Sequence, residues 1–433
     1  MLSIKNIKKL RGQYIGPSFS LSYDEPLHIV KGKGQYLYAS DGSQYLDAVN
    51  NISHVGHCHP RVIAALDEQN RLLNTNTRYL HNNIVTYADE LTNKLPAKLD
   101  VCYFTNSGSE SNDLALRMAR NYTDSNQTIV IAGAYHGHTN ATIEVSPYKF
   151  DGPGGVGSPD FVHQIPMPDP YRGKFRSNND DIALKYADSV QQILDVLNED
   201  NKQVAAFIAE AILGCGGQIF FPENFLAAAS KKVQQAGGLF IADEVQIGFG
   251  RVGSHFWGFE SENARPDIVT MGKSMGNGHP ISAVVTTKEI ADRFNNGMEY
   301  FNSFGGNPVS CAVGKAVLQV IEEEKLQENA FQVGEYLMDQ LNDLKQRHNI
   351  IGDVRGRGLF LGLELIKDHE KLTPASLEAE KIANDMKDHG ILISTDGPDH
   401  NVLKIKPPMV FTCDNADQLV ETLNKLLMKG DFN

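Results

Sequence analysis

Short apolar runs alternate with helix-like segments through the middle of the chain. The runs that predict buried strands lie at residues 101–105, 128–132, 204–209, 239–242 and 267–270. Residues 109–120, between the first two runs, have the spacing of apolar and polar positions that is typical of a helix. Alternation of this kind predicts parallel βαβ units with helices on both faces of the sheet. Ligands of such sheets bind at the carboxyl ends of the strands.

Other patterns flank this middle part. Residues 35–49 hold two β-prone runs on either side of an Asp-Gly pair, which predicts a hairpin. A long helical stretch follows Pro308, and leucine at every second position of residues 359–365 predicts a half-buried strand. Residues 150–180 are rich in glycine, proline and aspartate, which predicts a long surface loop.

Residues 402–406 alternate as well, so Leu403 and Ile405 are expected on one face of a strand and Lys404 and Lys406 on the other. We therefore expect an α/β protein in which a large domain with a mostly parallel sheet carries a smaller α+β domain built from both chain ends. The expected boundaries are 1–55 for the N-terminal segment that joins the small domain, 56–308 for the large domain and 309–433 for the C-terminal small domain.

The bulk composition narrows the class of protein. The chain has 433 residues, 41% of them hydrophobic and 21% charged, which is ordinary for a soluble globular protein of two or three domains. Its formal net charge of −13 argues against nucleic acid or an anionic membrane as the main partner. No apolar run approaches the roughly 18 residues of a spanning helix, and the first nine residues lack the pattern of a secretory signal.

The five cysteines are scattered and form no CxxC pair or Cys/His metal spacing. This usage predicts reduced thiols, a cytoplasmic protein and no metal site.

An amine and a carboxylate follow two of the predicted strands. Lys273 comes just after the strand at 267–270, and Asp243 ends the run at 239–242. Such a pair suits an aldehyde cofactor, because the lysine can form a Schiff base and the carboxylate can keep a pyridine nitrogen protonated. That is the arrangement of a pyridoxal-phosphate (PLP) enzyme, in which burial would lower the pKa of the lysine. The alternatives are a solvated surface lysine and a Mg²⁺-binding acid, although no Walker loop accompanies Asp243.

Further polar segments stand at strand ends. Ser107, Gly108 and Ser109 lie where a strand gives way to a helix, which predicts an anion site for a cofactor phosphate. The alternative is that Ser109 is only the N-cap of that helix. Tyr135, followed by His136, comes after another strand and could lie flat against the cofactor ring, or could be plain core.

Together these segments resemble the class III (ω-amino-acid) aminotransferases, PLP enzymes of fold type I. The matching segments, in the order of the family, are Ser107 to Asp113, Tyr135 to Gly137, Glu210 with the glycines after it, Asp243 to Gln246, Lys273, and Ser303 with Gly305 to Pro308. The resemblance implies that Lys273 holds PLP, Asp243 pairs with its ring nitrogen and Gln246 meets its phenolic oxygen. It also implies that Tyr135 stacks on the ring and that Gly108 and Ser109 bind the phosphate.

The same resemblance implies an assembly. Ser303 stands where the family has a threonine that it supplies to the neighbouring subunit. We therefore expect a homodimer, or a tetramer built from it, with active sites shared between subunits. Taken alone, the Gly-Gly-Asn-Pro turn after Ser303 would be a loop with no chemical role.

A narrower resemblance concerns the phospho-lyase branch of this family. It is carried by residues 50–60, 73–81, 101–110, 298–302 and 396–409. Many aminotransferases of the class hold an arginine for the substrate carboxylate just before a Pro-Pro pair, where this chain has Lys404. Lysine cannot make the two-pronged grip of arginine on a carboxylate. We expect Lys404 and Arg78 to help bind a substrate phosphate, the alternative for both being ordinary surface ion pairs.

The expected activity is elimination of phosphate from a small phosphorylated amine, with O-phosphoethanolamine giving acetaldehyde, ammonia and phosphate. The first alternative is a transaminase that moves an amine from an ω-amino acid or alanine to pyruvate or glyoxylate. The second is a non-catalytic protein with a PLP fold.

Overall fold

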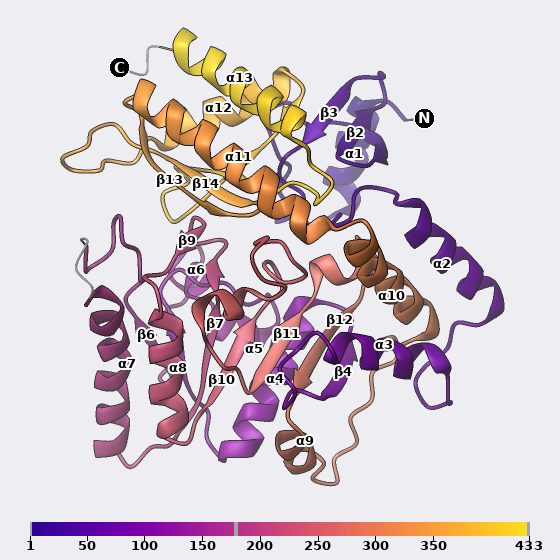
Figure 1. Cartoon of the computed structure of the whole chain (residues 1–433), viewed down its shortest axis with the longest axis vertical. Helices are drawn as coiled ribbons and strands as arrows, with labels where there is room; N and C mark the ends of the chain where they lie inside the picture. Colours follow the sequence, from indigo (N-terminus) through magenta and orange to yellow (C-terminus); the bar gives the residue numbers. More distant parts are fainter. Residues whose placement is uncertain (1, 177–180, 431–433) are drawn as a thin grey trace.

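The structure is a computed structural model that describes residues 2–176 and 181–430 (Figure 1). Within these residues the centre is a seven-stranded sheet in the order β4-β12-β11-β10-β7-β5-β6. Its strands are β4 (Val101–Thr105), β5 (Gln127–Ile131), β6 (Val162–Ile165), β7 (Val204–Glu210), β10 (Leu239–Asp243), β11 (Ile268–Met271) and β12 (Ser282–Thr286). Strand β12 runs antiparallel to both neighbours, and the pairings among β6, β5, β7, β10 and β11 are all parallel. The mostly parallel sheet expected from the sequence is confirmed.

Helices cover both faces of this sheet, as β7 illustrates. Phe207 and Ala209 pack into the same core as α7 (Ile182–Glu199) and α8 (Phe225–Gln235). Ala206 and Ile208 point the other way and join the core formed with α4 (Gly108–Thr123). Alternate side chains of a strand lie on opposite faces, so a strand covered on both sides must be apolar throughout.

Segments from the N-terminal and C-terminal parts of the chain lie together above the large sheet in Figure 1. A four-stranded antiparallel sheet has the order β13-β14-β17-β16, and a second sheet has the order β1-β2-β3-β15. Their strands are β13 (Ile351–Arg357), β14 (Phe360–Leu365), β16 (Ser394–Asp396), β17 (Val402–Ile405), β1 (Ile29–Lys33), β2 (Tyr36–Ala39), β3 (Gln44–Asp47) and β15 (Ile391–Leu392). Strands β2 and β3 form the expected hairpin, and β3 pairs in parallel with β15. The smaller α+β unit therefore draws on both ends of the chain, while its exact boundaries stay predictions.

The remaining elements complete the layers. They are α1 (Ile4–Tyr14), α2 (Pro60–Leu72), α3 (Asn82–Thr92), α5 (Asn140–Glu144), α6 (Pro147–Phe150), α9 (Lys288–Phe294), α10 (Pro308–Glu323), α11 (Leu326–Arg347), α12 (Ser376–Asp388), α13 (Cys413–Lys429), β8 (Ile212–Leu213) and β9 (Ile219–Phe220), with short 3₁₀ turns at Gly258–Glu262 and Lys273–Gly276. Among the helices of the described residues, none has the length and apolar character needed to cross a membrane.

Two expectations from the sequence are wrong in part. Every residue of β14 is buried, although alternating leucines predicted a half-buried strand. Glu364 stands on the presumed exposed face, but Arg355 donates to it at 2.7 Å and Arg172 also pairs with it, so that face is covered. Residues 150–180 are not loop throughout, because β6 pairs in parallel with β5 at the edge of the large sheet. Residues 177–180 lie outside the described part of the chain.

A close approach of two helices gives a stability prediction. Gly314 on α10 faces the buried ring of Tyr87 on α3, and an added Cβ would lie 2.5 Å from its Cζ. Gly314→Ala should lower the free energy of unfolding by about 1–3 kcal/mol, because a packed core resists an extra methyl group. Gly12→Ala on α1 is the control, since its Cβ would meet nothing within 4 Å. Urea unfolding that gave both variants the same stability would contradict this account.

Candidate active site

Two carboxylates and a lysine, Asp243, Glu210 and Lys273, meet at the carboxyl edge of the large sheet. Asp243 ends β10 and is in register with Glu210, which ends β7, and with Thr270 of β11. Lys273 follows β11 after one intervening glycine. They surround a cavity of about 110 Å³, lined by Gly108, Ser109, Asn112, Tyr135, His136, Gly137, Glu210, Asp243, Val245, Gln246 and Lys273. Residues that lie far apart in the sequence therefore share one edge of the sheet, as the sequence predicted.

The carboxylate of Asp243 is buried and held from several sides. Its Oδ2 accepts a hydrogen bond from Asn112 Nδ2 at 2.8 Å and lies 2.7 Å from His136 Nδ1. Its Oδ1 accepts from the backbone N–H of Val245 at 3.1 Å. Thr270 in turn donates to Asn112 Oδ1 at 2.6 Å, which fixes the orientation of that amide. The arrangement presents a fixed negative charge to the cavity.

Glu210 is a second buried carboxylate beside Asp243. Burial, and after it the neighbouring charge of Asp243, raises the pKa of Glu210 to about 7. The backbone N–H of Gly214 donates to its Oε2 at 3.1 Å. Because burial disfavours the charged form of a carboxyl group, we expect Glu210 to titrate near neutrality.

The start of α4 forms another wall. Ser107 is the N-cap, because its side chain accepts from the backbone N–H of Glu110 at 3.2 Å, so the alternative that Ser109 caps the helix is wrong. Gly108 and Ser109 lie in the first turn and line the small cavity, whereas Ser107 does not. A Cβ on Gly108 would come within 2.7 Å of Val245, so only glycine fits this close approach. Free N–H groups and the helix dipole make this turn suitable for an anion.

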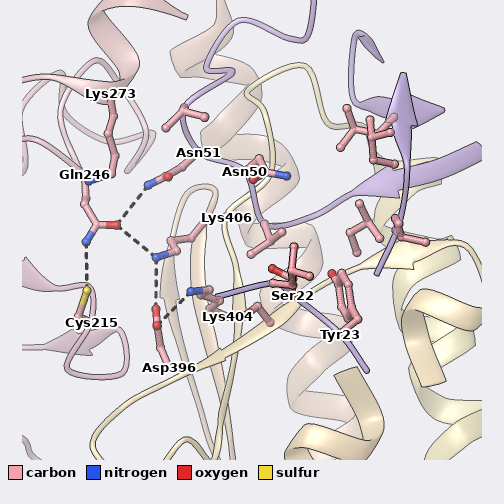
Figure 2. A pocket seen from close by; sticks show the side chains of 18 of the residues that line it. Ser22, Tyr23, Asn50, Asn51, Cys215, Gln246, Lys273, Asp396, Lys404 and Lys406 are labelled. Carbon is pink, nitrogen blue, oxygen red and sulfur yellow. Dashed lines mark hydrogen bonds and ion pairs between the residues drawn. The ribbon is translucent and has the colours of Figure 1, made fainter. Parts of the chain in front are cut away.

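Lys273 and Gln246 stand where the small cavity opens into a larger one of about 660 Å³. Figure 2 shows the two side chains next to each other at one side of the larger cavity. Lys273 is partly buried, and its backbone φ of +32° lies in a region that residues other than glycine rarely adopt. Strain of this kind is concentrated at functional sites. Tyr135 also lines both cavities and is partly buried.

A charged cluster lies next to Gln246 in the wall of the larger cavity (Figure 2). Lys404 Nζ lies 3.0 Å from Asp396 Oδ1, and Lys406 Nζ lies 3.4 Å from Asp396 Oδ2. Lys406 also donates to Gln246 Oε1 at 3.3 Å, and Asn51 donates to the same oxygen at 3.3 Å. The cluster therefore connects the small sheet at the chain ends to the residues of the large sheet.

Two predicted site residues lie elsewhere within this chain. Arg78 is exposed, pairs with Glu299 at 3.1 Å and lies over the ring of Phe301 at 4.3 Å. Ser303 is exposed as well, and neither residue lines the two cavities described above. Within one subunit Arg78 has the surface ion pair that was the alternative to a substrate contact.

Other residues of the site were missed from the sequence. Asn112 follows Gly108 by one helical turn and Lys406 follows Lys404 by two positions on a strand, so periodicity could have placed both in the site. Asp396 and Cys215 also line the larger cavity, and no local sequence pattern predicts their place there.

The residues around the two cavities fit PLP. The first turn of α4 suits a phosphate, Asp243 suits a protonated ring nitrogen, and Lys273 supplies an amine between them. His136 is buried, and its Nε2 has no hydrogen-bond partner among the described residues. The donor set needed by an aldehyde cofactor is therefore complete on this chain, apart from any group that a neighbouring subunit adds.

The raised pKa of Glu210 gives a prediction about stability and pH. Between pH 4.5 and 7 the folded protein keeps a proton on Glu210 that the unfolded chain releases, so stability falls as pH rises through this window. Glu210→Gln removes this titration, and its stability relative to wild type should rise by up to about 3 kcal/mol between pH 5 and pH 8. Urea unfolding of the cofactor-free proteins measures the change, with the exposed Glu25→Gln as control. A difference that does not vary with pH would refute the assignment.

Comparisons with known proteins agree with this geometry. The family model described as aminotransferase class-III matches residues 19–427. The alanine–glyoxylate aminotransferase 2-like protein of Drosophila melanogaster is 51% identical over 418 residues, which cover 95% of this chain and 85% of the relative. The ethanolamine-phosphate phospho-lyase homolog 1 of Caenorhabditis elegans is 43% identical over 438 residues, which cover 98% and 94%.

A solved structure is also similar over the whole chain. The phospholyase from Arthrobacter in complex with phosphoethanolamine superimposes with a TM-score of 0.92 at 38% identity, covering 98% of this chain and 100% of that one. The cytoplasmic location expected from the cysteines stays a prediction.

The chain belongs to the class III aminotransferase family of PLP-dependent enzymes and has their fold type I architecture.

Proposed function

We propose that the protein is a PLP-dependent phospho-lyase that eliminates phosphate from a phosphorylated amino alcohol, with O-phosphoethanolamine as substrate. One observation carries the proposal: the cations that line the two cavities are Lys273, Lys404 and Lys406, and no arginine is among the described lining residues. A transaminase that handles α-carboxylates benefits from the planar fork of arginine, whereas lysine binds phosphate well as a point charge. The phospho-lyase relatives support the same activity.

The site residues take the following roles in this proposal. Lys273 carries PLP, Asp243 faces its ring nitrogen, Gln246 donates to its phenolic oxygen, Tyr135 lies against the ring, and Gly108 and Ser109 bind its phosphate. His136 holds Asp243 in place through its Nδ1, and Glu210 lines the same cavity beside them. When bound, PLP supplies an electron sink for the carbon that bears the substrate amine.

The protein residues move one proton and stabilise one leaving group. Lys273, once displaced by the substrate amine, takes the proton from the carbon that bears it. The bond between the adjacent carbon and the phosphate oxygen then breaks, and the bonding electrons leave with phosphate. Lys404 and Lys406, which lie in the partly desolvated wall of the larger cavity, stabilise the negative charge that develops on the leaving phosphate. With one water consumed, O-phosphoethanolamine gives acetaldehyde, ammonia and inorganic phosphate, and no keto acid is needed.

A transaminase is the second candidate, because the Drosophila melanogaster relative at 51% identity carries an aminotransferase name. The two activities differ in what they require. A transaminase stops after one turnover unless a keto acid is supplied, whereas a lyase continues.

Release of phosphate without a keto acid tests the proposal directly. Holoenzyme given O-phosphoethanolamine alone should release inorganic phosphate over many turnovers, because elimination leaves the cofactor unchanged. Lys273→Ala is the matched control and should release none. Formation of at most one product molecule per site, with turnover restored by pyruvate or glyoxylate, would establish the transaminase instead.

The dimer with shared sites is also part of this proposal. Arg78 and Ser303 are exposed and lie on segments that also expose large apolar side chains, which include Tyr79, Leu80, Met298 and Phe304. Leu80 is fully exposed and Phe304 is 71% exposed in the single chain. The two segments adjoin where Arg78 pairs with Glu299, and exposed large apolar side chains in one region favour burial against a second copy. In that dimer Ser303 would reach the cofactor phosphate of the neighbouring subunit, and Arg78 its substrate.

Subunit mixing tests the shared site. Lys273→Ala and Ser303→Asp should each be inactive, the first for lack of the amine and the second because its charge repels the cofactor phosphate. Dimers re-formed from equal amounts should recover about a quarter of wild-type activity, since half are hybrids and each hybrid has one intact site. Gel filtration checks that both variants remain dimeric. Mixed dimers without activity would mean that Lys273 and Ser303 act in the same subunit.

A further inference from the structure

Lys406 is a buried cation whose hydrogen bonds to other residues are long. Only 4% of the residue is exposed, yet it lines the larger cavity. Its ammonium group has three N–H donors, and the two protein oxygens it meets, on Gln246 and Asp396, lie at 3.3 and 3.4 Å. Burial is the main cause that lowers the pKa of Lys406. A desolvated ammonium with long hydrogen bonds is stabilised when an anion enters beside it.

The charges near Lys406 leave this wall positive. Lys404 and Lys406 share the single carboxylate of Asp396, so two positive charges face one negative charge. Asp396 also accepts from Gln218 Nε2 at 2.9 Å, which holds the carboxylate back against the protein. On its other side Lys406 lies over the ring of Phe360 at 5.2 Å. A dianion is therefore a better match for the wall than a single carboxylate.

Side-chain contacts and burial distinguish Lys406 from Lys404, while the backbone of both residues is held. The backbone N–H of Lys406 donates to the carbonyl of Ala48 at 2.8 Å, and two prolines follow it. Its Nζ reaches Gln246, which lies between Lys406 and Lys273 at the edge of the larger cavity (Figure 2). Among the described residues no hydrogen bond joins Lys404 to Gln246, and 21% of the Lys404 side chain is exposed against 5% for Lys406. Lys406 is therefore the cation with a fixed position relative to the reacting end of the site.

We propose that Lys406 is the residue that determines the preference for phosphorylated amines, by binding the phosphoryl group from the buried wall of the larger cavity. The inference rests on the proposed function and makes it more specific. Asp396 is a positioning residue that keeps the two ammonium groups separate before substrate arrives. The hydrogen bond to Gln246 holds Lys406 on the side of the cavity that Lys273 also lines, so binding of phosphate also orients the substrate for proton removal.

Equilibrium binding to the holoenzyme tests this assignment. O-phosphoethanolamine and ethanolamine are titrated into wild type, Lys406→Met and Lys404→Met, and the change in visible absorbance of the cofactor gives each dissociation constant. We expect wild type to prefer the phosphorylated amine strongly. Lys406→Met should lose about tenfold or more of that preference while binding ethanolamine nearly as before, because only a charge-assisted contact to phosphate is removed. Lys404→Met should lose less.

A conservative variant and a simple anion complete the experiment. Lys406→Arg keeps the charge and should restore part of the preference, and inorganic phosphate should compete with O-phosphoethanolamine in wild type but weakly in Lys406→Met. Equal weakening of both amines in Lys406→Met, without rescue by arginine, would mean that Lys406 only supports Gln246 and would overturn the inference. A full preference kept by Lys406→Met would overturn it too. A wild type without any preference would reject the proposed function itself.

Discussion

The buried carboxylate of Asp243 is the constraint on which the site depends. An ionised carboxylate is costly to bury unless hydrogen bonds and positive partners compensate it. Here the compensation comes from His136, Asn112 and the backbone of Val245. These partners arrive from β5, α4 and β10, so the packing of the large sheet and the position of this charge are inseparable. A neighbour such as Glu210, whose pKa burial raises, can remain in the same site because it need not be charged.

The fold brings two chemically different groups of residues to the same pair of cavities. The carboxyl edge of the large sheet brings Lys273, Asp243 and the first turn of α4 together, which suits a cofactor with a phosphate and a ring nitrogen. The small sheet at the chain ends and the residue after its strand β17 contribute Asp396, Lys404 and Lys406 to the wall of the larger cavity. Gln246 is in contact with both sides. A substrate with an amine at one end and a phosphate at the other matches this division.

Much of this arrangement could be predicted from the sequence, for identifiable reasons. The apolar runs before Asp243 and Lys273 are strongly buried strands, so local pattern and tertiary structure agree. The half-buried prediction for β14 failed because Arg172 and Arg355 come from elsewhere to cover Glu364, which no local pattern reveals. The family position before the Pro-Pro pair points to Lys404 alone, although the strand period places Lys404 and Lys406 on one face. Arg78 and Ser303 depend on a surface that one chain alone does not complete.

The central claim is that the ε-amino group of Lys273 carries the cofactor. Borohydride reduction of the holoenzyme, followed by digestion and mass spectrometry, tests it most directly because reduction makes the linkage permanent. We predict a phosphopyridoxyl group on the peptide that contains Lys273 and on no other lysine. The same group on Lys404 or Lys406, or an unmodified Lys273, would contradict it.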